Sequence, residues 1–213
     1  MSGHDDFAFE PEPGLPAPLP KGEHKLWQGR PDAGAMAREC YKVNWITGYM
    51  LVLVVWRFAA GVADGGLMLG VAMAVPYLVL AALAYGVVYA LAWAQARASI
   101  YTITSARVIL RIGAALPVTY TIPFTRIATA RVDVKPSGTG TIALETLGED
   151  RLSYAVLWPH LRPGHARITQ PALRCIRDAK AVADLLAEAA ETRLNQPVIS
   201  RAPALQGSAV AAE

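Results

Sequence analysis

The residues best suited to chemistry gather in one stretch, LWPHLRPGHARITQPALRCIRDA, between Leu157 and Ala179. It holds two histidines, one cysteine and four arginines within 23 residues. Such side chains can form a nucleophile with its base, bind a metal ion, or anchor a partner molecule. Spacing and surrounding sequence decide among these three kinds of site.

The spacing does not favour catalysis or metal binding. His160 and His165 are five residues apart in a Pro/Gly-rich loop with no carboxylate between them, unlike the i, i+4 spacing of helical metal ligands. Cys175 falls on an expected strand, where a single cysteine is usually a small buried hydrophobe, and Cys40 shows no paired spacing with it. We expect a non-enzymatic protein with no catalytic residues, no metal and no cofactor.

The same loop is well suited to recognition. It is about thirteen residues long, more than a simple connection needs, and its prolines restrict its freedom. Tryptophan and arginine are enriched where the binding energy of an interface concentrates. The alternative is a loop that only covers one end of a sheet. The predicted partner-binding residues of the loop are Trp158, His160, Arg162, His165 and Arg167.

Two long apolar runs indicate a membrane protein. The chain is 54% hydrophobic and 17% charged, too apolar for an ordinary soluble domain of 213 residues. Residues 43–63 carry one charge and match the roughly 30 Å hydrocarbon thickness of a bilayer. A turn at 63–66 leads into a second run at 67–96, which Pro76 should bend. A two-helix transmembrane hairpin over residues 43–96 is predicted.

Arg57 interrupts the first apolar run. A charge at mid-bilayer costs at least about 2.5 kcal/mol unless it pairs or reaches the interface. Arg57 either snorkels toward Asp64 or contacts a partner's transmembrane helix, which makes it a further partner-binding candidate. The run from 43 to 96 contains no histidine, so an imidazole-ligated pigment is not expected.

After the hairpin the hydrophobic period changes from helical to alternating. The alternation predicts strands within 99–113 (two strands), 117–124, 127–134, 139–147, 151–158 and 171–176. Asp178 is placed to N-cap a helix over 179–194 with an apolar stripe. The expected class is membrane α + β, a transmembrane hairpin followed by a small antiparallel β domain closed by a C-terminal α-helix. The other predicted regions are a Pro-rich disordered arm at 1–22, a membrane-proximal segment joining the β domain at 23–42, the β domain at 97–194 and a flexible tail at 195–213.

The order of these parts resembles the membrane-associated bacterial pleckstrin-homology-like (PH-like) domains. That resemblance spans roughly residues 23–194. Its motifs lie before the hairpin, at the first strand turn and in the next two hairpins: Trp27, Gly29, Pro31, Thr104, Arg107, Ile122, Pro123, Ile127, Gly138 and Gly140.

Within that group, the stretch at 157–179 resembles the signature of the PuhB family of photosynthetic complex assembly proteins from purple phototrophic bacteria. This resemblance implies an assembly factor that binds reaction-centre subunits and core antenna polypeptides in the inner (intracytoplasmic) membrane. Membrane lipids are further expected partners, self-association is possible and nucleic acid is not expected. The alternative is a membrane-anchored module that binds anionic lipid headgroups through Arg97, Arg107, Arg111, Arg126 and Arg131.

The distribution of loop charges gives a testable topology. Basic residues flank both outer ends of the hairpin, whereas the turn carries only Asp64. The positive-inside rule therefore predicts that both termini are cytoplasmic. A reporter fused after Gly65 should report the periplasm, and one fused to the C-terminus the cytoplasm. A periplasmic signal from a fusion after Arg97 would instead mean a third span, which the charge rule disfavours.

Overall fold

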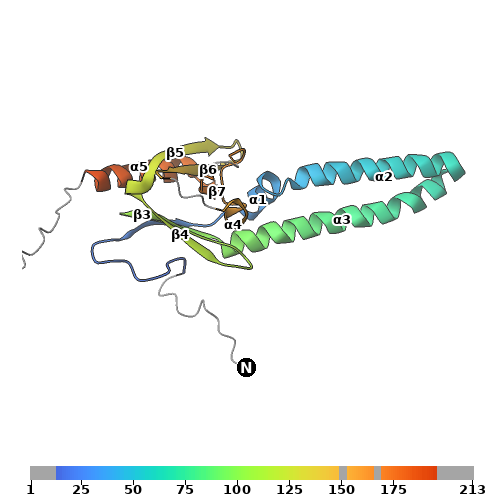
Figure 1. Cartoon of the computed structure of the whole chain (residues 1–213). Coiled ribbons are helices and arrows are strands. Elements are labelled where there is room, and N and C mark those ends of the chain that lie inside the picture. Colours follow the sequence, from blue (N-terminus) through green and yellow to red (C-terminus); the bar gives the residue numbers. More distant parts are fainter. Residues whose placement is uncertain (1–12, 149–152, 166–168, 196–213) are drawn as a thin grey trace, which may run out of the picture.

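A long helical hairpin extends from one end of a β domain (Figure 1). The computed structural model describes residues 13–148, 153–165 and 169–195. The hairpin pairs α2 (Val43–Gly65) with α3 (Leu67–Ala98), and the short α1 (Ala33–Glu39) precedes it at the junction. The predicted pair of helices is confirmed. Both are long and apolar enough to cross a membrane.

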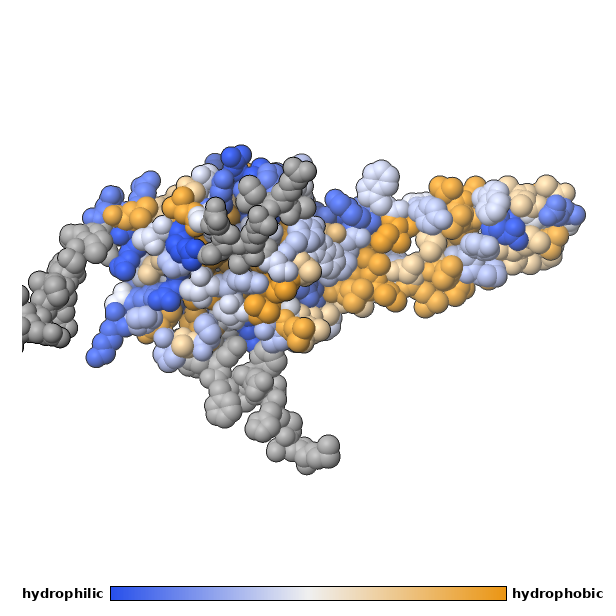
Figure 2. Space-filling model, in the orientation of Figure 1, coloured by the Kyte–Doolittle hydropathy of each residue, from blue (hydrophilic) through white to orange (hydrophobic). Residues whose placement is uncertain are grey.

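Glycines let the two helices of the hairpin meet closely near its tip. A Cβ on Gly61 would lie 2.7 Å from the Cα of Gly70, and one on Gly70 would lie 2.9 Å from the carbonyl oxygen of Phe58. Such small-residue contacts are how helices approach within a bilayer. The outward faces remain apolar: Trp45 is 79% and Met68 83% exposed. Apolar residues dominate the visible face of the hairpin, while hydrophilic ones gather over the β domain (Figure 2).

The β domain consists of two antiparallel sheets. In the first, β1 (Lys25–Gly29), β2 (Ile100–Thr104), β3 (Arg107–Ile112) and β4 (Val118–Pro123) are neighbours in that order. A 3₁₀ turn, η1 (Phe124–Arg126), leads to the second sheet, where β5 (Ile127–Val134), β6 (Thr139–Thr146) and β7 (Ala172–Arg177) are neighbours in that order. Only Ser99 separates α3 from β2, so the hairpin runs directly into the first sheet.

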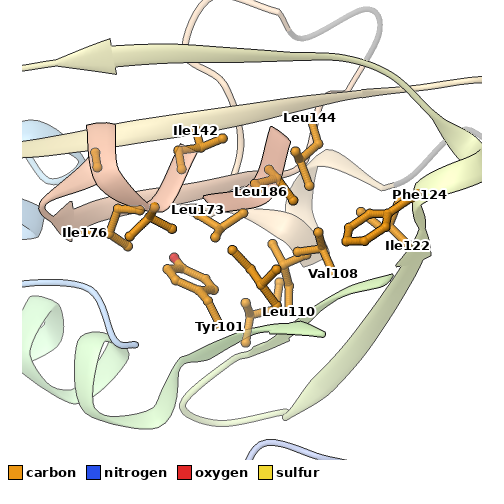
Figure 3. Packing of buried hydrophobic residues seen from close by; sticks show 14 of the residues in the cluster. Tyr101, Val108, Leu110, Ile122, Phe124, Ile142, Leu144, Leu173, Ile176 and Leu186 are labelled. Carbon is orange, nitrogen blue, oxygen red and sulfur yellow. The ribbon is translucent and has the colours of Figure 1, made fainter. Parts of the chain in front are cut away.

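The main hydrophobic core lies between the two sheets and is closed by α5 (Ala179–Leu194) (Figure 3). Alternate residues of the strands face inward, as the period-two pattern predicts. Val182, Leu186 and Ala189 of the predicted apolar stripe are buried, and Leu185 packs at the edge. The inward strand residues include Tyr101, Ile103, Val108, Leu110, Ile122, Ile142, Leu144, Leu173 and Ile176.

A second, smaller core joins the hairpin to the β domain. Met36 of α1, Val43 of α2, Ala92 and Ala96 of α3, and Cys175 of β7 are all buried in one cluster. In addition, the backbone N–H of Asp32 donates to the carbonyl of Cys175 at 2.7 Å. The base of the hairpin is thus packed against the second sheet as well as being continuous with the first.

Two local expectations differ from the structure. The strand predicted at 151–158 is wrong: residues 154–157 form α4 (Tyr154–Leu157), because so short an apolar run does not distinguish the two periods. The segment at 23–42, expected to join the β domain, does so through β1, and it also supplies α1. Asp178 stands at the N-cap position, yet its φ is +51° and its side chain makes no capping hydrogen bond.

Part of the predicted arm lies against the first sheet. Leu15 is buried, and the Nε2 of Gln28 donates to the carbonyl of Pro13 at 2.8 Å and to the Oγ1 of Thr102 at 3.0 Å. Residues 13–15 thereby lie beside β2, all of whose residues are buried. Residues 1–12 and the greater part of the predicted tail lie outside the described residues.

The core makes a direct stability prediction. Ile122→Asp would bury an unpaired carboxylate between the sheets, at a cost of several kcal/mol against a typical total of about 5–15 kcal/mol. Thr121→Asp, one residue earlier on β4, places the same group on the exposed face and is the matched control. Thermal unfolding of the full chain in nonionic detergent should show a large loss for the first variant alone. Equal melting of the two variants would mean that Ile122 does not face the core.

Candidate functional site

A buried histidine organises the base of the hairpin. His160 lies in the loop after α4 with no exposed surface. Its Nδ1 is 2.5 Å from the phenol oxygen of Tyr101 on β2, and its Nε2 is 3.0 Å from the Oγ of Ser99. Gln95 of α3 also contacts Nε2 at 3.3 Å. One side chain therefore links the loop to the last turn of α3 and to the first sheet.

The neighbouring hydrogen bonds suit a neutral imidazole. When Nε2 of His160 carries the proton, it donates to the Oγ of Ser99, which itself donates to the carbonyl of Gln95 at 2.7 Å; when Nδ1 carries the proton, Nε2 accepts from the side-chain amide of Gln95. The Tyr101 phenol oxygen accepts the backbone N–H of Arg174 at 3.3 Å, so its proton is available for Nδ1. The imidazole is thus a neutral structural link that both donates and accepts.

Burial and the nearby positive charge of Arg174 both oppose protonation, and they lower the pKa of His160 to about 3. Burial likewise raises the pKa of Tyr101 well above its ordinary value. Both groups are therefore neutral near pH 7. A general base in catalysis needs a pKa near the working pH and access to a substrate, and His160 has neither.

The other predicted loop residues are placed differently from one another. Trp158 is 43% exposed, and its ring packs edge-on against Tyr41 with centroids 5.0 Å apart. Arg162 is half-buried, and its Nη1 donates to the Oε1 of Gln170 at 3.1 Å. The Nδ1 of His165 lies 3.3 Å from the carbonyl of Pro163, and Arg167 lies outside the described residues. Trp158 and Arg162 are available to a partner, whereas the interpretation of His160 as a surface contact is wrong because it is buried.

Arg57 faces the other helix of the hairpin. Its Nη2 contacts the Sδ of Met73 at 3.3 Å, and its guanidinium lies 5.7 Å from the ring centroid of Tyr77 and 5.8 Å from that of Trp56. Cation–π contacts of this kind partly replace lost hydration. Arg57 is accordingly turned toward α3 rather than away from the hairpin.

The five arginines assigned to lipid contact do not share one surface. Because β2 leads away from α3, the turn before Arg107 lies at the end of the sheet far from the hairpin. Arg107 pairs there with Pro123 in the strand register, so Arg126 in the following turn lies at that end too. Arg97, in the last turn of α3, and Arg111, opposite Thr119, lie at the hairpin end. A single lipid-facing set that includes Arg107 and Arg126 is therefore wrong.

Arg107 instead has a structural role. Its Nε and Nη2 donate to the two carboxylate oxygens of Glu23 at 2.9 and 2.6 Å, and Thr104 donates to the same carboxylate at 2.6 Å. Burial raises the pKa of Glu23, but these hydrogen bonds and the charge of Arg107 leave it below its usual value. This pair holds the segment that begins β1.

A cavity of about 600 Å³ lies beside Trp158 and Arg162 at the hairpin end. It is bordered by the end of α1, the start of α2, the β5–β6 hairpin, β7 and the loop, and Arg131 contributes to its wall. Sequence reasoning missed Lys42, Lys135 and Arg174 as members of this site, since they come from separate elements with no common motif. Within the described ranges, no group of three or more His, Cys, Asp or Glu side chains could hold a metal ion.

Two cysteines that are far apart in the sequence meet beside this cavity. Cys40 and Cys175 lie close enough to shift each other's pKa, so that the pKa of Cys40 is lowered and that of Cys175 is raised. Cys175 also contacts the Oε2 of Glu39 at 3.9 Å. The two cysteines meet only because α1 packs against β7. Their spacing in the sequence therefore does not predict the contact.

The chain matches the bacterial PH domain family over residues 46–190. It is a member of that family. The match begins within α2 and ends within α5, so it takes in the hairpin as well as both sheets.

Two further proteins are similar to this bacterial PH domain protein. It is 52% identical, over 215 residues and the whole of both chains, to an uncharacterized 23.7 kDa protein in the puhA 5′ region of Rhodobacter capsulatus. It is 13% identical to a DUF1696 family protein with a pleckstrin-homology domain from Shewanella loihica PV-4. That likeness covers 43% of this chain and 71% of the other, with a TM-score of 0.29.

Lowering the pH should destabilise the protein through His160. Its folded-state pKa of about 3 lies below the unfolded value near 6.5, so between these values the unfolded chain binds a proton that the folded chain does not. The stability contribution is complete above pH 6.5 and falls as the pH drops, by about 2 kcal/mol at pH 5. Unfolding of the full chain in nonionic detergent at pH 7.5 and pH 5 measures this change.

His160→Gln is the control variant, because glutamine keeps a donor and an acceptor but does not titrate in this range. It should be less stable than the parent at pH 7.5 and should lose less stability between the two pH values. An identical pH dependence in the two proteins would show that His160 is not buried as a neutral base.

Proposed function

We propose that this protein is a membrane-anchored, non-enzymatic assembly factor for a photosynthetic complex. The observation that carries the proposal is an exposed apolar hairpin packed onto a domain whose Trp158 loop lies at its base. Outward residues on α2 and α3 are apolar over a length that suits a bilayer, so lipid or a partner's helices must cover them. The hairpin spans the membrane with both termini in the cytoplasm.

The photosynthetic context rests on two separate observations. The relative that is 52% identical along its whole length is encoded in the puhA 5′ region. The loop and β7 also carry the stretch that resembles the PuhB family of photosynthetic complex assembly proteins. The partners proposed are nascent reaction-centre subunits and core antenna polypeptides in the inner membrane of a purple bacterium.

The position of the loop suggests how a partner is held. Tyr154 and Trp158 are exposed aromatic side chains at the base of the hairpin, next to the start of α2. Aromatic side chains are typical anchors both at interfaces and at the membrane surface. A subunit whose helix packs beside the hairpin would present its cytoplasmic segment to this loop. The protein then acts by binding and positioning, without a chemical step.

Replacing the two exposed aromatics tests this role. Tyr154→Ala with Trp158→Ala removes the anchors without entering the main core, and Leu147→Ala removes an exposed apolar side chain at the far end of β6 as the matched control. Each variant replaces the native protein in a purple phototrophic bacterium. Membrane absorption should show a selective fall in assembled reaction centre and core antenna for the double variant, with normal amounts of the protein itself on an immunoblot.

Co-purification in mild detergent provides the second measurement. The tagged parent protein and the Leu147→Ala variant should retain reaction-centre polypeptides, and the double variant should not. Normal complex levels in the double variant would contradict the loop as the contact surface. Failure of the parent protein to retain any such polypeptide would contradict the assembly role.

A further inference from the structure

The cavity at the base of the hairpin is strongly cationic. Five basic side chains line it, against the carboxylates of Glu39 and Asp133. Asp133 pairs with Lys135 at 2.7 Å, which leaves four cations facing one carboxylate. Those four cations are Lys42, Arg131, Arg162 and Arg174.

Arg174 is a buried arginine whose side chain lacks a paired carboxylate in the part of the chain that the structure describes. Its side chain is on β7 and is only 7% exposed. Its Nη1 donates to the carbonyl of Leu161 at 3.2 Å, yet its buried Nε has no hydrogen-bond partner. Among the described residues no carboxylate lies within ion-pair distance of it. A buried guanidinium without a counter-charge is costly, so an anion in the cavity would stabilise it.

We propose that this cavity binds the phosphate group of an anionic membrane lipid. Phosphate oxygens accept charge-assisted hydrogen bonds from guanidinium groups, and Arg174 lines the cavity without a paired carboxylate in the described ranges. Arg162 and Arg131 lie on the loop and on β5, and Lys42 adds a flexible charge from the start of α2. The volume of about 600 Å³ is sufficient for a lipid headgroup.

The location favours a lipid over a soluble phosphate compound. Lys42 directly precedes the apolar residues of α2, and Trp158 on the cavity wall is a typical interfacial side chain. If the hairpin spans the bilayer, as proposed above, the cavity lies at the headgroup level of the cytoplasmic leaflet. That leaflet is where anionic lipids create a negative surface potential. The choice of a lipid source thus rests on the proposed membrane insertion, whereas the anion site itself does not.

Native mass spectrometry of the full chain in nonionic detergent tests the proposal. The protein is titrated with phosphatidylglycerol, and separately with zwitterionic phosphatidylcholine. We expect one tightly bound phosphatidylglycerol per chain and weaker binding of phosphatidylcholine. Arg174→Gln should weaken phosphatidylglycerol binding about tenfold, as the loss of one charge-assisted contact implies.

Two further variants guard against misfolding as an explanation. Lys42→Gln with Arg131→Gln alters only exposed residues of the cavity wall and should also weaken binding. Lys180→Gln, at an exposed residue of α5 that does not line the cavity, removes one positive charge as Arg174→Gln does and should bind as the parent does. Circular dichroism and gel filtration report whether each variant is folded. Undiminished phosphatidylglycerol binding in folded Arg174→Gln and Lys42→Gln/Arg131→Gln proteins would overturn the proposal.

Inorganic phosphate distinguishes the source of the anion. Binding of phosphate that needs Arg174, with no preference for phosphatidylglycerol, would overturn the lipid assignment in favour of a soluble phosphate compound. All these measurements use the purified protein without reaction-centre subunits. Loss of lipid binding in the parent protein and loss of co-purification with a partner are therefore separate outcomes.

Discussion

The packing of the hairpin against the β domain depends on the buried imidazole of His160. Both of its ring nitrogens must form hydrogen bonds with protein groups, because water does not reach them. His160 meets this constraint through Tyr101 and Ser99, while Gln95 adds a contact and accepts the backbone N–H of Ala114 at 3.2 Å. The network therefore joins α3, β2, the β3–β4 turn and the loop, and the backbone of Arg174 extends it to β7. Each of these polar groups would be costly to bury without a hydrogen-bond partner. The network therefore holds the hairpin, the two sheets and the loop in one fixed arrangement.

The consequence is a hairpin that is fixed to its domain at three places. α3 continues into β2 through one residue, α1 packs its buried side chains against α3 and β7, and the His160 network ties the loop to the last turn of α3. The exposed aromatics and the cationic cavity then lie together at the base of two apolar helices. A partner subunit and a lipid headgroup would meet the protein at the same level, so each could affect the binding of the other.

Local pattern predicted much of this fold, and long-range pairing accounts for what it missed. The apolar runs predicted α2 and α3 to within a few residues. The alternating pattern predicted β2 to β7, and the apolar stripe predicted α5 at 179–194. The segment at 154–157 was too short to show its period, and β1 has no strong alternation of its own. At the site, Trp158 and Arg162 were predicted from residue type. The burial of His160, the meeting of Cys40 with Cys175 and the unpaired Arg174 all follow from contacts between distant segments, which composition does not reveal.

The central claim is that the hairpin and the β domain form one unit in a bilayer. Spin labels at position 83 on the outward face of α3 and at position 121 on the exposed face of β4, with both native cysteines replaced by alanine, allow a direct test. Pulsed electron–electron double resonance in lipid nanodiscs would give the distance distribution between the labels. A single narrow distribution is predicted. A broad or multiple distribution would show that the domain moves freely on its anchor, and would contradict a fixed loop and cavity at the membrane surface.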